Sequence, residues 1–221
     1  MRYLHRPQPA PACLAKYNHQ NHDWSSSAPN SRDRNAIWKK LTQMQGGFCC
    51  YCESIAVKGN GHIEHFFYKG ENNSGNAPYK HMMFEWGNLF GSCGLRSGNT
   101  CGHYKDREGP LGPGPYDPSH LIKPDVDSPS DYFEFLPTGL INAKPGLSPE
   151  RENRARETLR VLNLSALNGA RKRQIDIFKR EIEALLELTS DDEILKRETD
   201  GIKKIIKESE YQTAVLSVLF G

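Results

Sequence analysis

Four cysteines in the middle of this 221-residue chain have the spacing of metal ligands. Cys49 and Cys52 are separated by two residues, so one tight turn can bring both thiolates to a single tetrahedral ion. Cys93 and Cys101 follow across a longer, glycine-rich gap and are available as the other two ligands. Closed four-cysteine sites hold zinc and stabilise segments that have little core of their own. The two pairs together predict a structural Zn²⁺ and argue against a set of unrelated buried thiols.

Between the cysteine pairs lies an acid–histidine dipeptide, Glu64-His65. The residues around it are β-prone, so we place it on a strand from His62 to Tyr68. A carboxylate there can hold a hard cation such as Mg²⁺, and a neighbouring imidazole can deprotonate a water near neutral pH. Neighbours on a strand point to opposite faces, so joint action needs a bent or exposed strand end.

Two further polar residues complete this set. Asn88, in a polar loop, can tie the strand to the next one through its side-chain amide, and His103, just after the last cysteine, is available as a second metal ligand. A single surface His or Asn usually has no special role. Together, inside a zinc frame, these residues indicate metal-assisted cleavage of phosphodiester bonds.

The residues of these motifs, and their order, resemble those of the HNH endonucleases, which have a ββα-metal fold. The resemblance lies between Phe48 and Asp106 and rests on Cys-x-x-Cys, Glu-His, Trp-x-Asn-Leu, then Cys and Cys-Gly-His-x-Lys. The strings Ile-Glu-His-Phe and Trp-Gly-Asn-Leu-Phe-Gly-Ser-Cys are closer still to the nuclease subunit of Septu-type and retron-associated antiphage systems. In many HNH enzymes a second C-x-x-C is followed at once by His or Asn. Here Cys93 and Cys101 are eight apart, and Gly102 stands in that place.

Carried over to this chain, the resemblance implies a metal-dependent nuclease of an antiphage system. It implies His65 as the general base, Glu64 as a ligand of a catalytic Mg²⁺ or Mn²⁺, Asn88 as the mostly structural central residue and His103 as the final metal-binding position. We add Lys105, at the start of the last helix of the motif, as a candidate phosphate contact. The implied partner is an ATPase related to the ABC and SMC families, accompanied in retron systems by a reverse transcriptase and its RNA–DNA product.

Two other functions fit parts of the pattern. His62-Ile63-Glu64 matches the H-x-E of zinc deaminases, but that signature needs P-C-x-x-C downstream and the C-x-x-C here lies upstream, so we reject it. A zinc-ribbon module that binds nucleic acid or a partner without cutting stays open as the alternative. The dipeptide Glu64-His65 distinguishes the two, because a carboxylate facing phosphate would only repel it in a module that merely binds.

The chain as a whole is polar but globular, with 37% hydrophobic residues and a formal net charge of +2. No apolar stretch approaches the roughly 20 residues that span a bilayer, and the first residues lack the apolar region of a signal peptide. We therefore expect a cytoplasmic protein without a membrane partner.

The expected fold class is α+β, with a zinc-stabilised ββα-metal core between an N-terminal arm and a helical region. We divide the chain into an arm and helix (1–47), the HNH-like core with its zinc site (48–109), a Pro/Gly-rich loop and β-hairpin (110–147) and the C-terminal helical region (148–221). In the first part a helix starts at Ser31 or Asp33 and stops at Gly46-Gly47. Further expected elements are a strand at 89–92, a short helix at 101–107, a hairpin at 132–141, helices at 149–162, 166–188 and 191–208, and an apolar tail to residue 221.

Charge is unevenly distributed over the C-terminal helices. Residues 151–180 carry nine Arg or Lys against three acids, whereas residues 181–210 carry ten acids against five bases. The basic stretch suggests a nucleic-acid track with Arg171, Lys172 and Arg173 as contacts, although a solvated helix face explains the same charges equally well. The acidic stretch would repel phosphate, so we expect it, with the arm, to dock a protein partner. No motif distinguishes DNA from RNA as the substrate.

Overall fold

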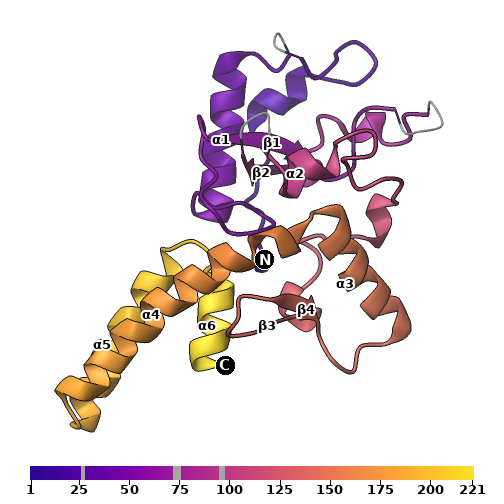
Figure 1. Ribbon diagram of the computed structural model, residues 1–221. Helices are drawn as coiled ribbons and strands as arrows, with labels where there is room; N and C mark the ends of the chain where they lie inside the picture. The colour runs from indigo at the N-terminus through magenta and orange to yellow at the C-terminus, as the bar shows by residue number, and fades with distance from the viewer. Residues whose placement is uncertain (26–27, 72–75, 95–97) are drawn as a thin grey trace.

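A computed structural model of the protein describes residues 1–25, 28–71, 76–94 and 98–221. The described part is mixed α+β, with two small antiparallel sheets among the helices (Figure 1). The helices are α1 (Ser31–Gln45), α2 (Cys101–Lys105), α3 (Pro149–Val161), α4 (Asn168–Leu188), α5 (Asp192–Lys207) and α6 (Gln212–Phe220), and the strands are β1 (Gly61–His65), β2 (Leu89–Cys93), β3 (Phe133–Phe135) and β4 (Ile141–Ala143). The predicted loop 69–80, the gap between the last two cysteines and the N-terminal arm each include residues outside the described ranges.

Helix α1 begins and ends where its sequence signals predict. The side chain of Asn30 accepts a hydrogen bond of 3.0 Å from the backbone N–H of Asp33, which satisfies one of the free donors at the helix start. Gly46 adopts the left-handed conformation at the end, with φ of 67°, which costs glycine little. Ile37 and Leu41 on the inner face are fully buried, so α1 covers the first sheet from one side.

Strands β1 and β2 pair antiparallel, with Glu64 opposite Phe90. The predicted strand 62–68 is wrong at its end, because β1 stops at His65. Beyond that point the backbone of Phe67 no longer continues the ladder: its N–H and C=O bond the side-chain amide of Asn88 at 2.7 and 3.0 Å. The observed β2 agrees with the prediction to within a residue.

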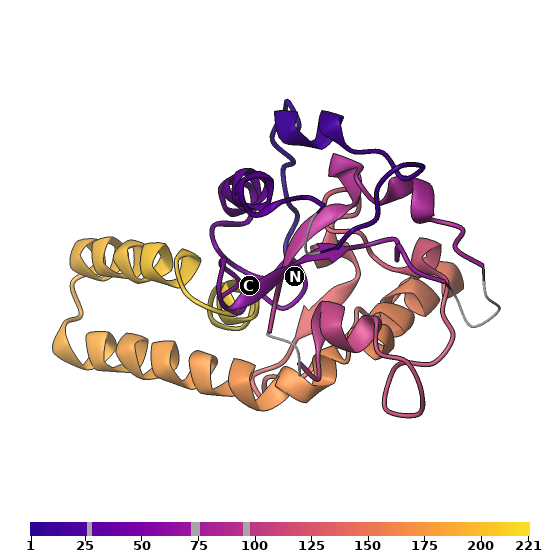
Figure 2. The same cartoon turned by 90° about the horizontal axis from the view of Figure 1, so that it is seen from above.

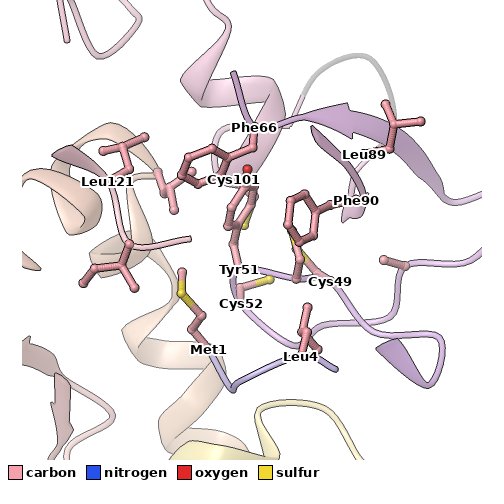
Figure 3. Close-up of a cluster of buried hydrophobic side chains, with 14 of the residues drawn as sticks. Met1, Leu4, Cys49, Tyr51, Cys52, Phe66, Leu89, Phe90, Cys101 and Leu121 are labelled. Atoms are coloured by element: carbon pink, nitrogen blue, oxygen red, sulfur yellow. The ribbon is translucent and has the colours of Figure 1, made fainter. Parts of the chain in front are cut away.

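The main hydrophobic core lies against this sheet and encloses the cysteines. Figure 3 shows the side chains of Tyr51, Phe66 and Phe90 meeting between the ribbon segments, with Cys49, Cys52 and Cys101 in the same cluster. All of these residues are buried. Apolar packing therefore stabilises the segment around the cysteines, in addition to any metal ion that the sulfurs bind.

The predicted hairpin and the helix after it are both present. Strands β3 and β4 pair antiparallel, with Phe133 opposite Ala143. Ser148 caps α3 by accepting the N–H of Arg151 at 3.4 Å, and a proline follows at the first helical position. The turn after α3 reaches back to the core, because the carbonyl of Leu162 accepts the N–H of Cys101 at 2.8 Å and fixes the start of α2.

Helices α4 and α5 form a hairpin that extends away from the rest of the molecule (Figures 1 and 2). Both helices were predicted, but the stretch predicted as an apolar tail is a helix, α6, which packs against them. Ile175, Phe178, Ile206 and Val215 form a second small core there. Helix α6 starts beside the cysteines, where the N–H of Thr213 bonds the Glu53 carboxylate at 2.8 Å. No helix in the described ranges is long and apolar enough to cross a membrane.

Candidate functional site

The four predicted cysteines meet at one point, which we call the cysteine cluster. Cys49 and Cys52 come from the loop before β1, Cys93 from the end of β2 and Cys101 from the first position of α2. Their sulfur atoms all lie within 4.8 Å of one another, and those of Cys52 and Cys93 are 3.5 Å apart. In the described part of the chain, no other group of three or more His, Cys, Asp or Glu has its ligand atoms this close. The predicted convergence of these cysteines is confirmed.

The local backbone is shaped to bring these sulfurs together. Glu53 adopts a left-handed conformation with φ of 68°, and its N–H returns to the carbonyl of Cys49 at 3.1 Å, which closes a tight turn. Ser92, on the neighbouring strand, lies with its hydroxyl 3.7 Å from the Cys49 sulfur. Burial alone would raise the pKa of Cys49, but hydrogen bonds from the surrounding thiols, that of Cys101 first, hold this pKa well below its usual range.

Glu64 is the buried anion of the site. Only 1% of its surface is exposed, and its carboxylate lies 3.0 Å from the Lys105 ammonium, 3.2 Å from His62 Nε2 and 3.3 Å from the Tyr51 hydroxyl. Burial would raise the pKa of Glu64, but the charge of Lys105 and the bond to His62 outweigh it and lower this pKa to about 2. Glu64 is therefore a carboxylate under all ordinary conditions.

Lys105 is not a surface residue, and its prediction as a phosphate contact is wrong. The side chain is completely buried, and its ammonium contacts Glu64, the Asp106 carboxylate and the carbonyl of His65 at 3.1 Å. Burial works against the charge, but Asp106 and Glu64 raise the pKa of Lys105 well above its usual value. Its role in this structure is to neutralise and orient Glu64.

The imidazole beside Glu64 is that of His62, which the sequence analysis did not include among the site residues. His103, predicted to share a cation with Glu64, instead directs Nε2 to the carbonyl of Gly94 at 3.1 Å. Its ring packs against that of His62 at a tilt of 36°, with the centroids 3.8 Å apart. Gly102 makes this arrangement possible, because a Cβ atom there would lie 2.2 Å from the Glu64 carboxylate and 2.7 Å from His62 Nε2. The signal for His62 was present, since residues two apart on a strand share a face.

His65 points to the other side of β1 from Glu64 and is 2% exposed. Its Nε2 lies 3.0 Å from the carbonyl of Met83, which places the proton on Nε2 and leaves Nδ1 as the basic nitrogen. Trp24, from the N-terminal arm, packs edge-on against the ring at 4.4 Å. Burial, with the charge of Lys69 acting in the same direction, lowers the pKa of His65 to about 3. The His65 ring is therefore neutral, is held in one orientation by Met83 and is shielded from solvent by Trp24.

Asn88 has the structural role that the sequence predicts. It is fully buried, and its amide bonds both backbone groups of Phe67 and, at 3.1 Å, the carbonyl of Met82. These bonds join the end of β1 to the segment that carries Met83. Because Met83 in turn orients His65, Asn88 acts on the histidine through the backbone.

The predicted basic contacts on α4 divide into two kinds. Arg171 is 3% exposed and donates to the carbonyls of Gly139 and Leu164, each at 2.9 Å, so its prediction as a nucleic-acid contact is wrong. A guanidinium in this position joins the hairpin turn to the start of α4. Lys172 and Arg173 are exposed, and their role as contacts stays a prediction.

No family model matches this chain, and a search of curated proteins finds no match to it. The chemistry of the site must therefore be argued from the arrangement of these side chains.

Proposed function

We propose that the protein is a metal-dependent nuclease of the HNH type that hydrolyses phosphodiester bonds in nucleic acid. The observation that carries the proposal is the order of elements around the cysteine cluster. An antiparallel pair, β1 and β2, is followed by the short helix α2, and the acid–histidine dipeptide lies at the end of β1. A buried Asn88 fixes the connection between the strands, as the resemblance to the HNH enzymes implies.

The cysteine cluster fits a structural Zn²⁺. Tetrahedral zinc with Zn–S bonds of about 2.3 Å places its sulfurs roughly 3.8 Å apart, and the sulfurs of Cys52 and Cys93 lie 3.5 Å apart. Zinc binds cysteine as the thiolate, and a bound ion would itself favour loss of the thiol protons. Such an ion would join the loop before β1, the end of β2 and the start of α2.

A catalytic Mg²⁺ or Mn²⁺ fits Glu64 and His62 better than the predicted pair of Glu64 and His103. Neighbouring ligands of an octahedral ion at about 2.1 Å lie roughly 3 Å apart, and Glu64 Oε2 and His62 Nε2 are separated by 3.2 Å. His62 would have to release its Nε2 proton to serve as a ligand. Such an ion, when bound, offsets negative charge that develops on the phosphate. His103 supports the His62 ring by packing against it, and Lys105 holds the carboxylate in place.

His65 is the proposed general base. The bond from Nε2 to Met83 holds the ring in one tautomer, so Nδ1 can accept a proton from water. The side chain is covered by Trp24 in this structure and lies on the opposite face of β1 from Glu64. Action on the same phosphate as a cation at Glu64 therefore requires the Trp24 ring to move and the end of β1 to turn. Displacement of the arm would thus precede catalysis.

A second candidate function, a zinc module that binds without cutting, is favoured by one observation. Glu64 is already neutralised by Lys105 and fully buried, as a carboxylate with a purely structural role would be. In that function the dipeptide would stabilise the fold, and binding would depend on exposed cations such as Lys172 and Arg173.

We further propose that the protein is the effector of an antiphage system and binds an ATPase subunit, with a retron reverse transcriptase and its RNA–DNA product where the system includes them. The support from this molecule is the α4–α5 hairpin, which extends from the body and exposes Leu186, Leu188 and Ile194 beside acidic side chains. Exposed apolar side chains among acids suit a basic protein surface and not nucleic acid.

The proposal is tested by incubating the purified protein with duplex DNA, single-stranded DNA and total RNA, in the presence of Mg²⁺, Mn²⁺ or a chelator, with and without the ATPase. Cleavage that needs the divalent ion is the expected result. Binding of any of these substrates without cleavage under all conditions would favour the zinc module.

A further inference from the structure

A pocket of about 630 Å³ opens beside the acid–histidine dipeptide. Three segments line it: residues 68–71 after β1, residues 105–109 at the end of α2 and residues 114–116 in the Pro/Gly-rich loop. The size lies within the usual range of small-ligand sites, about 300–1,000 Å³. Lys105 belongs to the pocket wall and is 3.0 Å from Glu64, so a group bound here lies one side chain away from the proposed site of cleavage.

The wall of this pocket is aromatic. Tyr68 and Tyr116 line it, with their rings at 77° and their centroids 6.0 Å apart. Tyr79 extends the aromatic surface, because its ring meets that of Tyr68 at 5.2 Å. A flat, polarisable ligand is the natural occupant of such a wall, since planar rings stack favourably on tyrosine.

The charges of the pocket select a neutral ligand with hydrogen-bond donors. Lys69, Lys105 and Arg107 are matched by three acids, so the pocket attracts neither a free anion nor a free cation strongly. The side chain of Asp106 is 39% exposed and presents a carboxylate that can accept from an exocyclic amine. The rim is open at Gly109, where an added Cβ would meet no atom within 4 Å.

We propose that this pocket binds an unpaired nucleobase next to the phosphate that is cut, so that the substrate is single-stranded or locally unpaired. This inference rests on the proposed nuclease function. A base inside a duplex is stacked on both faces and cannot enter a pocket of this kind without being extruded. Cytosine, adenine and guanine carry an exocyclic amine for Asp106, whereas uracil and thymine do not.

The test measures binding separately from cleavage. Oligonucleotides that contain one 2-aminopurine are titrated with the full chain in a chelator at a concentration that leaves the zinc in place, and stacking is followed by quenching of the fluorescence. The single-stranded DNA and RNA forms should bind about tenfold or more tightly than the same sequence in a duplex. Tyr116→Ala should lose about tenfold in single-strand affinity, Tyr116→Phe should keep it, and Tyr3→Ala, outside the pocket, is the control. The DNA and RNA arms identify which nucleic acid is preferred.

Equal affinity for single strand and duplex, or no loss in Tyr116→Ala, would overturn the inference. Tyr116 is partly buried, so Tyr116→Ala could fail to fold. In that case Tyr68→Ala, on the facing wall, should show the same loss of single-strand affinity. Single-strand binding that depends on these tyrosines but leads to no cleavage would support the nucleobase pocket and contradict the proposed nuclease function. Duplex cleavage at the same rate with and without both tyrosines would support the nuclease function and contradict the nucleobase pocket.

Discussion

Glu64 and His65 are adjacent in the chain but meet opposite surroundings, because neighbours on a strand point to opposite faces. Glu64 faces α2 and is held as a carboxylate by Lys105. His65 faces the segment around Met83 and is held neutral by burial under Trp24. The environment therefore keeps Glu64 charged and His65 neutral.

The burial of His65 predicts a dependence of folding stability on pH. Its pKa is lowered from 6.5 to about 3 in the folded state, so the unfolded chain binds the proton between these values. The histidine's contribution is complete above pH 6.5 and is lost as the pH falls below it, at about 1.4 kcal/mol per pH unit. Between pH 7.5 and 5.5, the free energy of unfolding should fall by about 1.4 kcal/mol more in wild type than in His65→Gln. Denaturant titrations with the zinc content measured at each pH check this, and parallel curves would contradict it.

Among the elements, the cysteine cluster joins three segments that also pack in the main hydrophobic core. The C-x-x-C turn, the end of β2 and the start of α2 each contribute at least one sulfur. An ion bound there would hold α2, with its buried Lys105, against the sheet.

We predict about one zinc per chain, as expected for one four-cysteine site. Cys93→Ser should lose the zinc and unfold the central region, because structural zinc contributes on the order of 10 kcal/mol to such sites. Cys13→Ser should keep both metal and stability, since the Cys13 sulfur lies outside the cluster, 3.6 Å from the carbonyl of Asp33. Elemental analysis and thermal melts provide the measurements. Folded, soluble wild type without zinc would contradict the assignment.

The N-terminal arm makes its own prediction through Trp24. Trp24→Ala should expose the ring of His65 and increase the rate at which diethyl pyrocarbonate modifies it, because the reagent reacts with neutral, accessible imidazole. Mass spectrometry of the peptide that carries His65 measures the rate, and Tyr3→Ala serves as the control. An unchanged rate in folded Trp24→Ala would show that the arm does not cover the histidine.

Local signals in the sequence predicted the elements well and the partners of buried charges poorly. The cap at Asn30, the stop at Gly46 and the cysteine spacing act over a few residues, so α1 and the cysteine cluster were found. Composition does not show which charges a distant segment covers, so the sequence predicts Arg171 and Lys105 as surface cations. Arg171 meets the carbonyl of Gly139, 32 residues away, and Lys105 meets that of His65, 40 residues away. His62 was missed because the H-x-E spacing was tested only against another enzyme class.

At the scale of the whole molecule, the α4–α5 hairpin is the part that the proposed site does not need. It carries exposed apolar side chains, of which Leu188 is 83% exposed, and it projects from the rest of the molecule (Figure 2). Removing everything after Leu188 would also remove Thr213, which bonds Glu53 beside the cysteines. Point substitutions on the hairpin are therefore the cleaner way to test docking.

We predict that Leu186→Glu combined with Leu188→Glu abolishes co-purification with the proposed ATPase subunit while leaving zinc content and thermal stability unchanged. Both side chains are exposed, so the substitutions cost the fold little. Arg156→Glu, at an exposed position of α3, is the surface control. Binding that survives the double substitution would place the interface elsewhere. Failure of wild type to bind would contradict the proposal of an ATPase partner.

The most direct test of the account is the rate at which His65→Ala cleaves the best substrate of wild type in the presence of Mg²⁺ or Mn²⁺. His120→Ala, on the surface, serves as the control, and all three proteins must have equal zinc content and be folded at the assay temperature. We predict a loss of about two to four orders of magnitude in His65→Ala and none in His120→Ala. Cleavage by His65→Ala at the wild-type rate would contradict it.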